Sequence, residues 1–203
     1  MKTFLSIGGV KIPLTESQFE QIRAAIATEP RRRIADVPVG ETFKIDCYEF
    51  VVLEQMSGQT AVILKDILKE DVFGDSNRLS GSNADEICCE FAEAIADLVG
   101  YDGIVEHEVD LTSDDGLKDY GSVQCLASPL TAAQYRQYVD VLDCHNPKVW
   151  WWLATPFSTK KHDDCNYVKC VSPSGCLSSS RCRDRGRGVR PFLIFKSNIF
   201  VSV

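Results

Sequence analysis

The run Trp150-Trp151-Trp152-Leu153 constrains the fold of this chain more than any other segment. Four consecutive large apolar side chains predict a strand, and in a strand successive side chains point to opposite faces. Trp150 and Trp152 therefore share one face, and Trp151 takes the other. At least one face is expected to belong to the core. We prefer this interpretation to an exposed stacking site for sugars or bases.

Strand patterns surround the tryptophan run on both sides. The first three expected strands are separated by turns at Asp46-Cys47 and at Gly58, which is typical of an antiparallel meander. Ser172-Pro173-Ser174-Gly175 predicts a tight turn. The expected strands are Thr42–Ile45, residues 48–53, 60–64 and 150–153, Tyr167–Val171, and residues 188–195 and 199–203.

Two helices are expected in the body of the chain. The first has its apolar face at Ile87, Phe91, Ile95 and Leu98 and ends at Gly100. The second begins with a capping box formed by Thr131 and Gln134. Its apolar stripe is Tyr135, Tyr138, Val139 and Leu142, and it ends before Pro147.

Residues 1–34 are expected to form a separate small element of strand and helix. Strands are expected at Thr3–Ile7 and around residues 10–12. Thr15 and Gln18 form a second capping-box pattern, and Phe19, Ile22 and Ile26 follow at helical spacing. Pro30 ends this helix, and we interpret Arg31-Arg32-Arg33 as a solvated linker rather than a nucleic-acid contact. The domain organisation is thus 1–34 and 35–203.

Composition narrows the class of protein. No apolar run is long enough to span a bilayer, and the N-terminus lacks the features of a cleaved leader, so synthesis in the cytoplasm is expected. The nine cysteines are then expected to be reduced thiols. We expect Cys47, Cys88 and Cys89 to be small buried hydrophobes. Burial is less expected for the last four, which are Cys165, Cys170, Cys176 and Cys182.

The motifs of the common catalytic sites are missing from the sequence. It has three histidines, none in a recognisable nucleophile motif, and no phosphate-binding loop, dinucleotide fingerprint or zinc-protease motif. His162 and the last four cysteines could supply zinc ligands, but the cysteines are five or six residues apart rather than two to four. The acidic stretch at Asp110, Asp114 and Asp115 lacks the calcium-loop pattern and is interpreted as a solvated loop. We expect no catalytic residues, no metal and no cofactor.

Positive charge is concentrated near the C-terminus. Residues 160–190 hold eight Lys or Arg against three Asp, a balance of +5, so the rest of the chain carries −7 − 5 = −12. Within this region, residues 176–187 have almost no apolar content. They are interpreted either as a flexible basic loop or as a binding surface, because arginine makes bidentate contacts with carboxylates and phosphates.

Two motifs frame this basic region: Trp151-Trp152-Leu153-Ala154-Thr155-Pro156 before it and Gly188-Val189-Arg190-Pro191 after it. Together with residues 36–68 and 111–117, they resemble a family of gut bacterial and phage proteins of unknown function with a C-type-lectin-like fold. Some members look like targets of diversity-generating retroelements. The resemblance covers about residues 35–203. It implies an α+β, C-type-lectin-like fold with mixed antiparallel sheets and two main helices. Formylglycine-generating and related iron or copper enzymes share this fold, but their metal and paired-cysteine motifs are not found in the sequence.

The resemblance also implies where a ligand binds. In retroelement-diversified proteins, randomised asparagine codons cannot encode Lys, Glu, Gln, Met or Trp, and residues 170–195 contain none of these five. A Ser/Arg-rich loop would also lack them by chance. Trp151, Trp152 and residues 188–191 correspond to framework, with Arg190 anchoring the fold through a buried polar contact. The implied ligand-contact residues are His162, Asp163, Asp164, Cys165, Asn166, Tyr167, Ser178, Ser179, Ser180, Arg181, Cys182, Arg183, Asp184 and Arg185.

The expected function is therefore that of a non-enzymatic receptor-binding or ligand-binding protein with a variable surface. Its expected partner is a protein or glycan of a bacterial surface, acidic or phosphorylated, without nucleic-acid binding or membrane insertion. Homo-oligomerisation is left open. The expected location is a phage virion, or the cytoplasm or surface of a bacterium without a cleaved signal peptide. Two alternatives are a structural or decoration component of a virion, assembled through residues 1–34, and an enzyme or zinc protein.

Overall fold

The tryptophan run lies in strand β12 (Trp150–Pro156), which is buried on both faces. The computed structural model describes residues 3–7, 10–21 and 31–203. Trp152 and Ala154 belong to one apolar cluster of the core, whereas Trp151 and Leu153 belong to a second. The expected alternation is confirmed. Both faces of β12 are packed, one against each apolar cluster.

β12 is the central strand of a five-stranded sheet with the order β14-β13-β12-β15-β7. β12 and β15 run parallel, and the other neighbours are antiparallel. The sheet is therefore mixed. The flanking strands are β7 (Lys69–Glu70), β13 (Tyr167–Val171), β14 (Leu177–Arg181) and β15 (Arg187–Val189).

An eight-stranded antiparallel sheet forms the other large layer and curls as a half-barrel. Its order is β11-β16-β6-β5-β4-β17-β3, and β8 also pairs with β16. The expected meander is confirmed as β4, β5 and β6. β17, near the C-terminus, pairs with both β3 and β4, so the two ends of the body meet in one sheet. The bounds are β3 (Arg31–Arg33), β4 (Thr42–Ile45), β5 (Tyr48–Met56), β6 (Gln59–Leu64), β8 (Ile104–Val105), β11 (Ala127–Pro129), β16 (Pro191–Lys196) and β17 (Phe200–Ser202).

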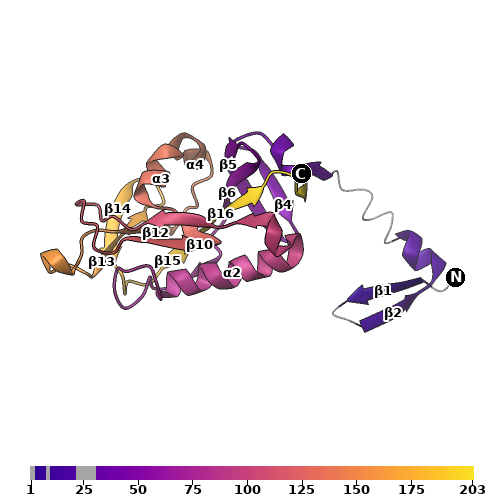
Figure 1. Ribbon diagram of the computed structural model, residues 1–203, viewed down its shortest axis with the longest axis horizontal. Helices are drawn as coiled ribbons and strands as arrows, with labels where there is room; N and C mark the ends of the chain where they lie inside the picture. Colours follow the sequence, from indigo (N-terminus) through magenta and orange to yellow (C-terminus); the bar gives the residue numbers. More distant parts are fainter. Residues whose placement is uncertain (1–2, 8–9, 22–30) are drawn as a thin grey trace.

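The long helix α2 (Asn83–Val99) runs along one side of the body, as Figure 1 shows. Ser82 caps its first turn, and Gly100 ends it with a φ of 86°, a conformation that glycine adopts most easily. Ile87, Phe91 and Ile95 are buried as expected. The prediction of Leu98 as a core residue is wrong. It is 50% exposed, because the last turn extends to the rim of the core beside Phe200, which is also exposed.

The expected second helix is divided into α3 (Ala132–Gln137) and α4 (Val139–Cys144). The capping box of Thr131 and Gln134 is confirmed. The division falls at Tyr138, whose hydroxyl donates a hydrogen bond to Glu54 Oε2 at 2.6 Å. Val139 is exposed, contrary to the expected stripe. Three single turns complete the helices: η1 (Ile34–Asp36), η2 (Tyr101–Gly103) and η3 (Lys160–His162).

The strand expected over residues 188–195 was also wrong, because it is two strands in two sheets. β15 belongs to the five-stranded sheet and β16 to the half-barrel, and Arg190 lies between them. In β15, a Cβ on Gly188 would come 2.2 Å from Ile67 Cγ2, so only glycine fits this close approach. The break falls at Arg190-Pro191, where a charged residue and a proline interrupt the apolar residues, and this local signal was overlooked in expecting one strand.

The N-terminal residues form a hairpin and a helical segment. β1 (Thr3–Ile7) pairs with β2 (Val10–Leu14), and residues 16–21 are helical after a Thr15–Gln18 capping interaction. Ile22, Ile26 and Pro30 lie outside the described residues. Arg31-Arg32-Arg33 is not a solvated linker, because it forms β3 and pairs with β17. The body therefore begins by Arg31, a few residues before the expected boundary.

The cysteines are all free thiols in the structure, but their burial differs from expectation. Cys88 is buried as expected, whereas Cys47 lies in an exposed turn and Cys89 on an exposed part of α2. In the polar C-terminal region, Cys170 is buried because strand alternation points it into the core, and Cys182 is buried in the turn after β14. Cys165 is partly buried and Cys176 is exposed.

No helix in the described ranges is long and apolar enough to cross a membrane.

The buried His107 predicts a dependence of stability on pH. This residue of β9 (His107–Asp110) is 8% exposed, and burial lowers its pKa from 6.5 to about 4. The folded state therefore keeps the ring neutral where the unfolded chain would bind a proton. This contribution to stability is complete above pH 6.5 and is lost as the pH falls toward 4. Over this window the free energy of unfolding is expected to decrease by about 3 kcal/mol, measured by urea titration.

Carboxylates also titrate between pH 4 and 6.5, so the informative quantity is the difference from a variant. His107→Gln should have a shallower decrease in the free energy of unfolding over this window. Asn198→Ala is the control, because Asn198 is exposed and has no titratable group. Equal pH slopes for the wild type and His107→Gln would contradict the assignment.

Candidate functional site

The two segments predicted to contact ligand meet in the β13–β14 hairpin. The strands pair Tyr167 with Arg181 and Val168 with Ser180, so residues 162–167 and 178–185 come together at its open end. The expected turn at residues 172–175 closes the other end. There the backbone N–H of Cys176 donates to Ser172 Oγ, and Gly175 has a φ of 81°.

Strand alternation sorts these residues into two groups. Tyr167 and Arg181 lie on the outer face, whereas Ser180 and Cys182 point inward and are 6% and 2% exposed. Ser180 Oγ lies 3.3 Å from the Cys170 thiol, inside the sheet. Ser180 is therefore framework rather than a ligand contact, and Cys182, although buried, stays at the wall of the candidate site. The alternation of arginine with Ser180 and Cys182 in the sequence was a signal for this division.

The segment 176–187 is also not a continuous loop. Leu177–Arg181 is strand β14, and only the turn that follows it is irregular. All five residues of β14 pair with residues of β13. This pairing makes the segment a strand, although its serine-rich sequence does not by itself predict one. The exposed arginines at the end of this segment are thus carried on a rigid hairpin.

A cavity of about 330 Å³ opens where the two segments meet, lined by Asn166, Tyr167, Arg181, Cys182 and Arg183. Arg181 Nε donates to Tyr167 Oη at 3.0 Å, and its guanidinium carbon lies 5.8 Å from the centre of that ring. This contact with Tyr167 raises the pKa of Arg181. Tyr167 also packs against Phe157, which is 42% exposed, with ring centres 6.4 Å apart.

The remaining arginines of the segment have different environments. Arg183 makes an exposed ion pair with Asp75 at 3.2 Å, and Arg185 is exposed. Arg187 is half-buried and lies over the rings of Trp150 and Trp152, with distances of 5.8 and 5.4 Å. Arg187 therefore packs with the framework, whereas the preceding arginines remain available to a ligand.

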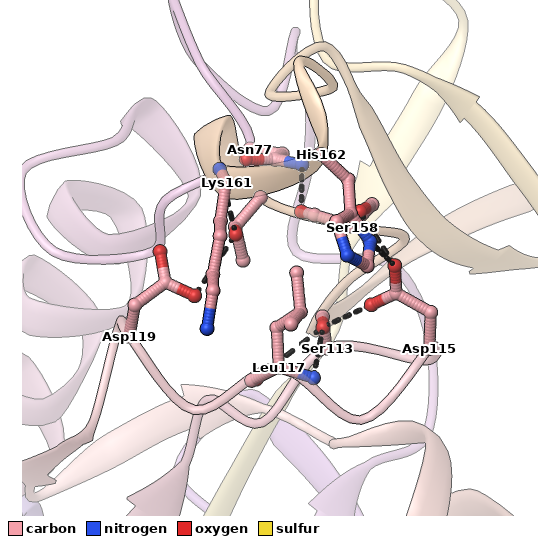
Figure 2. Close-up of polar contacts among 9 residues, drawn as sticks. Asn77, Ser113, Asp115, Leu117, Asp119, Ser158, Lys161 and His162 are labelled. Carbon is pink, nitrogen blue, oxygen red and sulfur yellow. Dashed lines mark hydrogen bonds and ion pairs between the residues drawn. The ribbon is translucent and has the colours of Figure 1, made fainter.

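Loop residues 157–166 carry the first half of the candidate surface and are held by a polar network (Figure 2). At its centre is Asn77, which is fully buried. Asn77 Nδ2 donates to the carbonyls of Ser158 and Tyr167 at 2.9 and 2.8 Å, and Tyr120 Oη donates to Asn77 Oδ1 at 3.0 Å. The backbone N–H of Asn77 also donates to the Cys165 carbonyl. One side chain thus fixes both ends of this loop.

The acidic loop after β9 is the second support of this network. Asp115 accepts hydrogen bonds from Ser113 Oγ and Ser158 Oγ, and its Oδ2 lies 2.9 Å from His162 Nδ1. These three contacts hold the pKa of Asp115 well below its usual range. Asp119 Oδ1 accepts from Thr159 Oγ1 at 2.9 Å. Figure 2 shows the carboxylates of Asp115 and Asp119 on either side of the loop that they hold.

Asp114 extends this support to the hairpin itself. Its carboxylate pairs with Lys169 of β13 at 3.1 Å and with Arg136 of α3 at 3.4 Å. The interpretation of Asp110, Asp114 and Asp115 as a merely solvated loop was therefore incomplete. Asn77, Asp115 and Asp119 were missed because their partners lie some 40 to 80 residues away in the sequence.

The contacts of His162 differ from those of a serine relay. A serine relay needs the hydroxyl on one imidazole nitrogen and the carboxylate on the other. Here Ser113 and Ser158 both donate to the carboxylate of Asp115. His107 Nε2 lies 3.1 Å from Ser128 Oγ, and His145 Nε2 lies 2.9 Å from the Gly40 carbonyl. Within residues 3–7, 10–21 and 31–203, no three His, Cys, Asp or Glu side chains group as metal ligands.

The comparison with protein-family models gives a match that covers much of this site. Residues 106–197 match a domain of unknown function, DUF6273. The match runs from just before β9 to just after β16, so it contains the acidic loop, the hairpin and residues 188–191. No curated protein and no solved structure matched the chain.

Proposed function

We propose that this chain is a ligand-binding module that presents the open end of the β13–β14 hairpin to an anionic ligand. The observation that carries the proposal is the cavity of about 330 Å³, which combines two arginines with an amide and an aromatic ring. Guanidinium groups bind carboxylates and phosphates through paired hydrogen bonds. Tyr167 and Phe157 add a partly exposed aromatic surface on which a ring can pack.

We further propose that the scaffold is C-type-lectin-like. The terminal strand β17 pairs with β3 and β4, so the body closes on itself in one sheet. A smaller mixed sheet includes the β13–β14 hairpin. The core contains residues of both sheets, and α2 packs against it. This arrangement supports a rigid frame with a separate contact surface. A role as a bacterial or phage receptor-binding protein, as opposed to a virion decoration, is part of this proposal.

The arginine content of the surface gives a direct test. The triple variant Arg181→Ser, Arg183→Ser and Arg185→Ser is expected to weaken binding of an acidic glycan or phosphorylated peptide by at least about tenfold at low salt. Arg187 is left unchanged because it packs on Trp150 and Trp152. Binding would be measured by surface plasmon resonance on ligands selected from an array of bacterial surface glycans and proteins.

A matched control is available in β3. The variant Arg31→Ser, Arg32→Ser and Arg33→Ser removes the same charge from three exposed residues of another sheet edge. It should leave affinity within about twofold. If both triple variants weaken binding equally, net charge rather than the hairpin recognises the ligand, and the proposal fails.

Diversification of the surface is tested on the gene. We expect codons ending in C or T at the exposed positions among residues 181–185, together with a nearby template copy that has asparagine codons there. Codons ending in A or G at these positions would reject diversification, while the binding proposal would stand on its own test.

A further inference from the structure

A second groove lies on another part of the body, between helix α2 and strand β10 (Ser122–Cys125). Its volume is about 490 Å³. One wall is formed by Asp85, Cys89, Ala92 and Glu93, whose spacing places them on one side of the helix. Figure 1 shows β10 alongside α2.

The opposite wall is the edge of a strand rather than its face. Three consecutive residues of β10, 123–125, line the groove, whereas a strand face would contribute every second residue; Leu126 and Ala127, the first residue of β11, continue this wall. In the described part of the chain β10 pairs only with β9, in a two-stranded sheet. The other edge of β10 therefore presents backbone N–H and C=O groups that a further strand can pair with.

The charge around the groove has one sign. Asp85, Glu93 and Glu106 line it, and none of its lining residues is Lys or Arg. Ala92, Val123 and Leu126 supply apolar surface between the carboxylates. Cys125 adds to this surface, because burial and the nearby Asp85 raise its pKa to about 12 and keep the thiol neutral.

We propose that this groove binds an extended, cationic peptide segment of a partner protein, which adds to β10 as an antiparallel or parallel strand. Backbone pairing with β10 supplies affinity, and the carboxylates select lysine or arginine side chains. Alternate side chains of the guest strand point toward α2, where Ala92 and Cys89 leave room between Asp85 and Glu93. This site is separate from the hairpin surface and prefers the opposite charge.

The test uses the full chain and a fluorescein-labelled octapeptide of alternating lysine and valine as the probe. Fluorescence anisotropy should show saturable binding, and NMR should show shifts of the backbone amides of residues 122–126. The variant Glu93→Gln and Glu106→Gln is expected to weaken binding about tenfold. The control variant Glu86→Gln and Asp97→Asn removes the same charge from α2 outside the groove, and should change affinity less than twofold.

Two altered probes separate the parts of the proposal. The same peptide N-methylated at every residue has no backbone N–H donor on either edge, so it cannot form the ladder with β10 and should not bind. An alternating glutamate and valine peptide should not bind either. Equal binding of the N-methylated probe, equal loss in the two protein variants, or no binding of the cationic probe would overturn the proposal. Concentration-dependent self-association that Glu93→Gln and Glu106→Gln abolishes would also overturn it, in favour of a second copy as the occupant.

Discussion

Replacing Arg190 by alanine is expected to lower the free energy of unfolding by about 4 kcal/mol. Arg190 is fully buried at the crossing between the two large sheets. Its Nε donates to the Leu64 carbonyl at 2.7 Å and its Nη2 to the His145 carbonyl at 3.0 Å. The guanidinium lies 5.2 Å from the centre of the Trp151 ring. Alanine would leave two carbonyls without these donors and a void beside an indole.

Chemical denaturation of Arg190→Ala measures this effect. Burial lowers the pKa of Arg190 to about 10, so the side chain remains cationic at neutral pH. Arg190→Lys keeps the positive charge but not the planar guanidinium that donates to two carbonyls. Its loss of unfolding free energy is expected to lie between those of the wild type and Arg190→Ala. Arg183→Ala is the control, because the side chain of Arg183 is 71% exposed and its removal should cost less than about 0.5 kcal/mol. A loss below 1 kcal/mol for Arg190→Ala would contradict an anchoring role.

Replacing Asn77 by alanine is expected to lower the free energy of unfolding by about 3 kcal/mol and to loosen the candidate surface. The substitution leaves the Ser158 and Tyr167 carbonyls and the Tyr120 hydroxyl without their buried partner. Hydrogen exchange should then accelerate at the amides of His162 and Asp164, whose hydrogen bonds lie within the loop.

Two further variants define the range of this effect. Tyr120→Phe removes one hydrogen bond of Asn77 and should cost about 1 kcal/mol. Asn198→Ala changes an exposed asparagine and should leave both stability and exchange unchanged. If Asn77→Ala is as stable as the wild type, or if exchange accelerates uniformly over the chain, the network does not hold the loop.

The two segments of the candidate site were implied by a family resemblance rather than by residue type alone. The framing motifs carried that resemblance to residues 162–167 and 178–185, and the β13–β14 pairing brings them to one end of a hairpin. The resemblance did not separate outward-facing from inward-facing side chains. The alternation of Ser180 and Cys182 with arginine hints at two faces, and the pairing of Ser180 with Val168 and the bond from the Cys182 N–H to the Asn166 carbonyl show that both residues are buried.

The sequence by itself determined the faces of local elements. The alternation of Trp150 to Leu153, the capping boxes at Thr15 and Thr131 and the stop at Gly100 all depend on neighbours within a few residues, and the structure has each of them. Such patterns show whether a segment has the period of a helix or a strand and where that segment begins or ends. They do not show which distant residues will cover its apolar face.

The tertiary structure alone decided which sheet each side of Arg190 joins and how the surface is supported. Arg190-Pro191 interrupts the apolar residues between β15 and β16, but only the fold brings Arg190 to the carbonyls of Leu64 and His145. Asn77 meets Ser158 across 81 residues, and Asp115 meets the same residue across 43. Hydrogen bonds of this range depend on the complete packing of the chain, so no local period encodes them.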